Sequence, residues 1–230
     1  MWQALRTELH PRGLEIVTVA LDTGGAEAAR PWIEAARPEH PSLIDQAHIT
    51  DELFGFVNVP NGVWIDEQGM LVRPAEPAWP PREPNATRYA DIPADAPQRL
   101  KDMLGEARKI RTDPAGYVAA LRDWVEHGAD SRYALAPDEV VARSQPRPAE
   151  QARAAAAFEL GQYLWREGQR EAAVGWFRES QRLHPDNWTY KRQAWSFADP
   201  LQGPTDLYDS DWLSDIQAIG AENYYPTISW

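Results

Sequence analysis

The spacing of apolar residues along the first part of the chain predicts alternating helices and strands. Residues 2–9 carry apolar side chains at helical spacing, and Pro11 ends that helix. Residues 14–21 form a mostly apolar run rich in β-branched side chains, typical of a central strand buried on both faces. A second helix is expected over residues 26–36, with alanine and tryptophan along one side.

The pattern continues with a short strand at residues 42–45 and a short helix at residues 49–56. Residues 62–66 and 70–72 are apolar runs separated by a turn that contains Gly69, which predicts a hairpin. This order of elements predicts parallel pairing of the first two strands through a helical crossover, completed by the antiparallel hairpin.

Beyond the hairpin the composition changes. Residues 73–97 hold seven prolines, which predicts an extended connection and a domain boundary. Apolar stripes at helical spacing follow, so the rest of the chain is expected to be helical. We therefore divide the chain into an α/β domain (1–76), a proline-rich linker (77–97), an all-helical domain (98–205) and an acidic, aromatic tail (206–230).

Residues 154–187 match the spacing of one tetratricopeptide-like helical repeat. Gly161 on its first helix and Ala173 on its second are small enough to let the helices approach closely. A single repeat favours a packing role, and a peptide receptor is the alternative. For a receptor, we assign protein binding to Leu160, Trp176 and Phe177.

The tail contains five bulky aromatic rings in 25 residues, too many for a purely disordered segment. We expect it to fold back onto the core.

Charge and hydropathy exclude several classes of partner. The 23 basic and 35 acidic side chains give a formal charge of −12, which disfavours nucleic acid as a partner. No apolar run reaches the ~18 residues of a membrane helix, and residues 1–20 lack the apolar core of a signal peptide. A cytoplasmic location with no membrane partner is therefore expected, and the oligomeric state is left open.

The chain contains no cysteine, which removes disulfides, thiolate metal sites and thiol catalysis. Its five histidines are scattered without ligand spacing, so no metal site is expected. The aspartates of residues 206–215 lack the glycine and the terminal glutamate of a calcium loop. Residues 23–25 lack the lysine of a phosphate loop. We expect no cofactor, and no catalytic residue is assigned.

One resemblance organises these observations. Residues 13–22, GLEIVTVALD, resemble the sequence segment that follows the Cys-x-x-Cys motif in TlpA/ResA-like redoxins of the thioredoxin fold. Residues 51–72 resemble the same family's helix, cis-proline loop and hairpin. The resemblance implies an incomplete thioredoxin-like α/β domain followed by an all-α, tetratricopeptide-like domain. It also implies that Pro60 is the cis-proline and that the Val59 backbone contacts an extended substrate.

The same resemblance places Met1 inside the first helix of the fold. The preceding strand and the two redox residues would then lie upstream, and the neighbouring strands would keep unpaired edges. Similar proteins, the ResA-like proteins with a WAxxUGxxC motif, carry selenocysteine in that segment. We therefore expect an N-terminally truncated redoxin.

Three functions follow as hypotheses. The first is thiol- or selenol-dependent exchange with a protein disulfide or peptide, or peroxide reduction, by a protein whose reactive residues are absent from this chain. The second is a non-catalytic module that binds a protein through the thioredoxin-like or helical part. The third is a non-redox enzyme that uses carboxylates, which no motif supports. Whether the chain is an enzyme stays open, because the family resemblance is to oxidoreductases and the chain has no cysteine.

Overall fold

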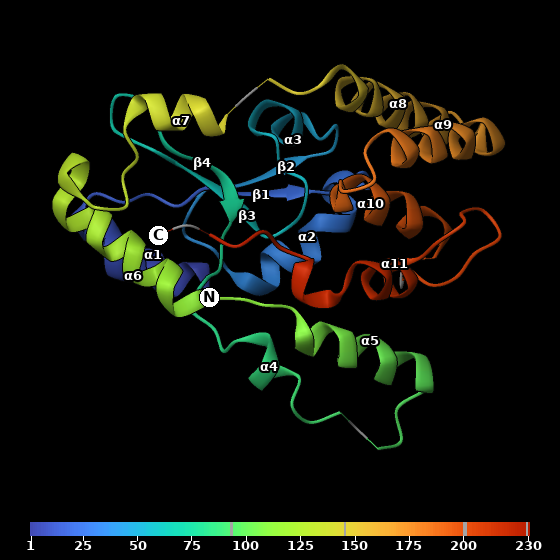
Figure 1. Ribbon diagram of the computed structural model, residues 1–230, viewed down its shortest axis with the longest axis horizontal. Coiled ribbons are helices and arrows are strands. Elements are labelled where there is room, and N and C mark those ends of the chain that lie inside the picture. Colours follow the sequence, from blue (N-terminus) through green and yellow to red (C-terminus); the bar gives the residue numbers. More distant parts are fainter. Residues whose placement is uncertain (93, 145, 200–201, 229) are drawn as a thin grey trace.

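Two short sheets lie at the centre of the N-terminal half of this computed structural model (Figure 1). β1 (Thr18–Leu21) and β2 (Ser42–Asp45) pair in parallel, and β3 (Asn61–Ile65) and β4 (Leu71–Pro77) pair antiparallel. The fold is therefore mixed α/β, and both pairings predicted from the sequence are confirmed. The structure describes residues 1–92, 94–144, 146–199, 202–228 and 230.

Helices surround the sheets and form most of the C-terminal half (Figure 1). The first are α1 (Trp2–Leu9), η1 (His10–Arg12), α2 (Gly25–Ala36) and α3 (Ile49–Phe54). After the hairpin come α4 (Asn85–Arg88), α5 (Gln98–Lys109), α6 (Pro114–His127), η2 (Gly128–Asp130) and α7 (Pro137–Arg143). The last are α8 (Ala149–Arg166), α9 (Arg170–Leu183), α10 (Trp188–Ala198), α11 (Trp212–Ile219) and η3 (Ala221–Asn223).

β1 differs from the strand expected over residues 14–21. Only Thr18–Leu21 is extended in a ladder, all four residues are half-buried, and Val17 is 52% exposed. Burial of a strand on both faces requires a sheet that continues on both sides of it. β1 has one strand neighbour within the described residues, so the prediction of a central, doubly buried strand is wrong.

The first hydrophobic cluster, which we call the sheet-side cluster, joins α1, β3, the segment after β4, and α6. Trp64 of β3 stacks on Trp124 of α6 with ring centroids 5.0 Å apart. Its indole N–H donates to the Tyr117 hydroxyl at 3.1 Å. The sequence places α6 in the helical domain of residues 98–205, but here α6 packs with the sheets.

The second cluster, the helical cluster, is built around the α8 and α9 pair and α10. Phe158 stacks on Tyr190 with centroids 4.3 Å apart, and Phe177 lies fully buried against Phe197. A Cβ on Gly161 would lie 2.7 Å from the Phe177 ring. The absence of a side chain at Gly161 therefore makes room for Phe177.

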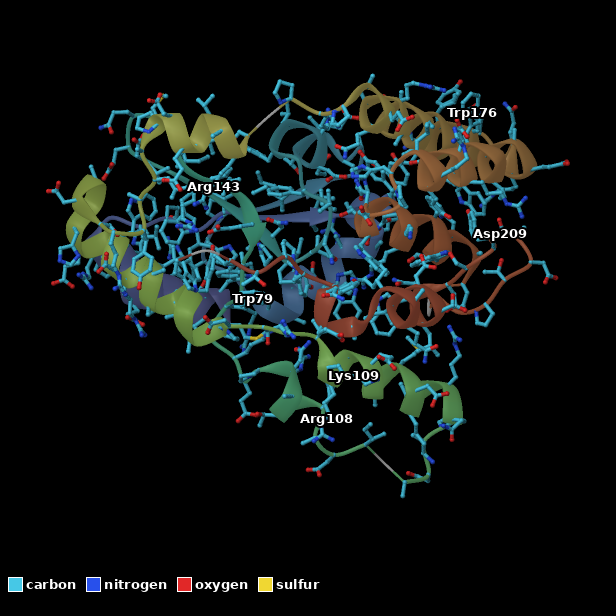
Figure 2. All side chains as sticks on the ribbon, in the orientation of Figure 1. Trp79, Arg108, Lys109, Arg143, Trp176 and Asp209 are labelled. Atoms are coloured by element: carbon cyan, nitrogen blue, oxygen red, sulfur yellow. The ribbon has the colours of Figure 1, made fainter. Side chains whose placement is uncertain are left out.

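The linker and the tail both pack against the core. Trp79 of the linker is buried in the sheet-side cluster and lies among the central side chains of Figure 2. This burial anchors the proline-rich linker to the core. In the tail, Trp212, Ile216 and Tyr224 are buried in the helical cluster. The expectation that the tail folds back onto the core is confirmed.

Gly161→Ala is expected to lower the free energy of unfolding by up to about 2 kcal/mol. The added methyl group overpacks a site filled by a fully buried ring, at a cost of about 1–3 kcal/mol, and the better helix propensity of alanine returns about 1 kcal/mol. Urea unfolding measures the change.

Gly175→Ala in α9 is the matched control, because a Cβ there meets no atom within 4 Å. This variant is expected to gain about 0.5–1 kcal/mol from helix propensity alone. An equal gain in both variants would contradict the close packing of Gly161 on Phe177.

Candidate functional site

A groove of about 710 Å³ runs between β1 and β3. One side consists of residues 14–19, which lead into β1, and the other consists of residues 59–65, which lead through β3. Trp2, Tyr117 and Trp124 from α1 and α6 complete the lining. The groove is therefore mostly apolar, and backbone segments form its two long sides.

The Val59–Pro60 peptide bond is cis, as the family resemblance implied, and both residues line the groove. The backbone of Val59 already has partners within the chain. Its N–H donates to the Asn58 side-chain oxygen at 2.8 Å, and its carbonyl accepts a 2.6 Å hydrogen bond from the Tyr225 hydroxyl. Tyr225 of the tail therefore occupies the Val59 carbonyl, which belongs to the backbone that was assigned to substrate contact.

The groove has few charged side chains. Among its described lining residues Glu15 is the one charged group, and the neighbouring Arg6 guanidinium lowers the pKa of Glu15 to about 2. Burial raises the pKa of the Tyr117 phenol, so Tyr117 keeps its proton. An ionised, paired Glu15 and a neutral Tyr117 do not form a general base or a nucleophile. The groove is suited to binding.

A second cavity, of about 590 Å³, lies between α3, β4, the segment leading into α8, and the start of α10. We call it the Asp51 cavity. Asp51 is fully buried, and no described residue makes a hydrogen bond of good geometry with either of its carboxyl oxygens. Arg147, Asn187 and Tyr190 line the same cavity.

Burial raises the pKa of Asp51 well above its usual range, despite the nearby Asn187 and Arg147. Burial also lowers the pKa of His184, which lines the cavity. Burial therefore favours the neutral forms of both Asp51 and His184. No role for Asp51 was predicted from the sequence. The short helix α3 also carries Glu52, so nothing along the chain distinguishes Asp51 from a surface carboxylate.

The residues assigned to protein binding in the helical part separate in the structure. Trp176 is 41% exposed at the outer side of α9 (Figure 2). Leu160 is half-buried. Phe177 is completely buried, so its assignment to direct partner contact is wrong. Helical spacing identifies the repeat, but the face on which Phe177 lies depends on where α10 packs.

No three histidine, aspartate or glutamate side chains within the described ranges lie close enough together to hold a metal ion. None of the helices in the described part of the chain is both long and apolar enough to cross a membrane.

Comparisons with protein-family models, with curated proteins and with solved structures gave no match for this chain.

Asp51→Asn is expected to raise the free energy of unfolding at pH 7 and to flatten its pH dependence. The pKa of Asp51 is higher in the folded chain than the value of about 3.9 in an unfolded chain. Its contribution to stability is therefore complete below about pH 4, and it is lost as the pH rises toward the folded-state pKa.

Urea unfolding of both proteins between pH 4 and pH 8 measures the effect. Asp91→Asn, at an exposed aspartate, is the matched control and is expected to leave the pH dependence unchanged. A gain for Asp51→Asn that is as large at pH 4 as at pH 7 would show that Asp51 is not protonated in the folded chain.

Proposed function

We propose that this chain is the substrate-binding part of a thioredoxin-like redox protein that acts on a protein disulfide or an extended peptide. The observation that carries the proposal is the apolar groove between β1 and β3, with Val59 and Pro60 at its side. The thiolate or selenolate would come from a segment outside the 230 residues, since the chain has no cysteine. The helical half would be a tetratricopeptide-like packing module.

The chemistry would be thiol–disulfide exchange. A thiolate or selenolate attacks one sulfur of the substrate disulfide, a mixed bond forms, and the other sulfur leaves as a thiolate. In that reaction, the residues of this chain bind the substrate and orient it. The Val59 carbonyl accepts a backbone N–H of the extended substrate in the manner of strand addition, and the apolar side chains keep water from the exchanging bond.

The second candidate is a non-catalytic protein-binding module. Its supporting observation is the exposure of Trp176 together with Tyr163 on the α8 and α9 pair, since exposed aromatic side chains are typical of interfaces. The two candidates differ in chemistry, so a redox assay of the protein with its upstream segment separates them.

The coding sequence upstream of Met1 gives a direct test. The redox proposal expects a strand-like run followed by a Cys codon or an in-frame UGA within ~40 codons, about one strand–helix–strand unit. An upstream frame without either codon contradicts it. The 230-residue chain itself is expected to give no insulin reduction above the dithiothreitol background, and turnover by this chain alone would also contradict the proposal.

Tyr225→Phe is expected to tighten the binding of an extended polypeptide about fivefold. The change removes the hydroxyl that occupies the Val59 carbonyl, and a freed hydrogen-bonding group contributes about 1 kcal/mol. The probe is alkylated, fluorescein-labelled insulin B chain, and anisotropy titration gives the Kd.

Tyr208→Phe is the matched control, because Tyr208 is buried in the helical cluster and does not line the groove. It is expected to leave the Kd unchanged. Equal or weaker binding by Tyr225→Phe would exclude the Val59 carbonyl as a substrate contact.

A further inference from the structure

The Asp51 cavity has no part in the function proposed above. Its volume is about 590 Å³, and its lining comes from α3, the β3 and β4 hairpin, the adjoining ends of α7 and α8, and the end of α9 with the start of α10. Arg143, one of the lining residues, is the last residue of α7 (Figure 2). Ligand pockets enclose roughly 300–1,000 Å³, so this cavity has room for a small organic molecule.

Asp51 is the buried polar group of this cavity that lacks a partner. Asn187 and Tyr190 of α10 lie next to its carboxyl group and line the same cavity. Asp51 is 2% exposed, and neither of its carboxyl oxygens has a hydrogen-bond partner of good geometry among the described residues. Buried carboxyl groups are normally hydrogen-bonded or paired, so this arrangement points to a ligand group beside Asp51.

The charges around the cavity select the sign of that ligand group. Arg147 pairs with Glu52 at 3.8 Å, and Arg143 pairs with Glu139 of α7. Ionised Asp51 is then the one lining charge, within the described residues, that has no ion-pair partner. A positive ligand group compensates a buried carboxylate, and a negative group is repelled by it. The formal charge of −12 also favours the approach of cations.

Apolar side chains form another part of the lining. Phe54 comes from α3, and Val63, Leu71 and Pro74 come from the hairpin. Burial of a hydrocarbon or aromatic body against such side chains contributes about 25 cal/mol per Å² of apolar surface. A ligand that matches both parts of the lining carries a single positive group on an apolar body.

We propose that the Asp51 cavity binds a small organic ammonium compound with an apolar body, and that Asp51 is its counter-charge. The ammonium group lies beside Asp51 and Tyr190, whose carboxylate and phenol oxygens are hydrogen-bond acceptors. The apolar body lies against Phe54 and the hairpin. This site uses neither the groove nor the redox chemistry proposed above.

Binding of a cation is expected to release a proton from Asp51 to the solvent. Burial raises the pKa of Asp51, and a neighbouring cation favours the ionised form. Burial lowers the pKa of His184, and its neutral form does not repel the ligand. Both effects tighten the binding as the pH rises. The titratable and charged groups around Asp51 are Asp45, Glu52, Arg147, His184 and Tyr190.

Isothermal titration calorimetry with three probes of similar shape tests the proposal. At pH 8 the cation 2-phenylethylamine is expected to bind with a Kd of about 1 mM or lower. The neutral 2-phenylethanol is expected to bind at least about tenfold more weakly, and the anion phenylacetate is expected not to bind. Between pH 8 and pH 5 the Kd of the amine is expected to rise about tenfold or more, the effect of at least one pH unit of titration.

Asp51→Asn is expected to weaken binding of the amine tenfold or more and to remove most of the pH dependence. Glu15→Gln is the matched control, because Glu15 is the charged residue that lines the neighbouring groove. Phe54 and Val63 line both the groove and the cavity, so this control detects an amine bound in the groove instead. It is expected to leave the Kd of the amine unchanged.

Four results would overturn the proposal. They are no binding of the amine, equal binding of the amine and the alcohol, a Kd of the amine that does not change between pH 5 and pH 8, and a loss of affinity in Glu15→Gln as large as in Asp51→Asn. The pH dependence is measured on the unchanged protein, so the proposal is tested even if Asp51→Asn does not fold. None of these measurements depends on redox activity.

Discussion

The arrangement of this protein depends on an aromatic contact between its two hydrophobic clusters. Tyr225 packs against both the sheet-side cluster and the helical cluster, and its neighbour Tyr224 lies 4.6 Å from the Trp188 ring. At the same junction the Trp188 backbone N–H donates to the Val57 carbonyl at 2.7 Å. The loop that holds Val59 and Pro60 is therefore fixed between the tail and α10, so the shape of one end of the groove is set by residues more than 100 positions away.

Backbone pairing is the second constraint. A strand satisfies its N–H and C=O groups through neighbours on both sides, and β1 and β3 each have one such neighbour among the described elements. α1 and α6 pack near these strands, but a helix does not provide the row of backbone hydrogen-bonding partners that a neighbouring strand provides. The groove therefore combines apolar side chains with polar backbone edges, and the proposed binding of an extended polypeptide rests on this combination.

Much of the local structure could be predicted from the sequence. Apolar spacing identified α1, β2, the β3 and β4 hairpin, and the α8 and α9 pair, because each depends on neighbours along the chain. The cis bond at Pro60 agreed with the family resemblance. The predictions that failed depended on distant partners. Residues 14–21 have the composition of a central strand, but β1 lacks a neighbour on one side. Phe177 has the spacing of a repeat residue, but α10 covers it.

The sequence by itself determined the mixed α/β order of elements, the parallel and antiparallel pairings, the absence of cysteine from these 230 residues and the return of the aromatic tail to the core. Hydrophobic period and residue chemistry are local properties, so they can be read along the chain. Only the tertiary structure decided that α6 joins the sheets, that Tyr225 occupies the Val59 carbonyl, that Asp51 is buried in a cavity and that two open strand edges share one groove. Each of these four features depends on which distant segments pack together. The burial, the pKa and the hydrogen-bond partners of a residue follow from that packing.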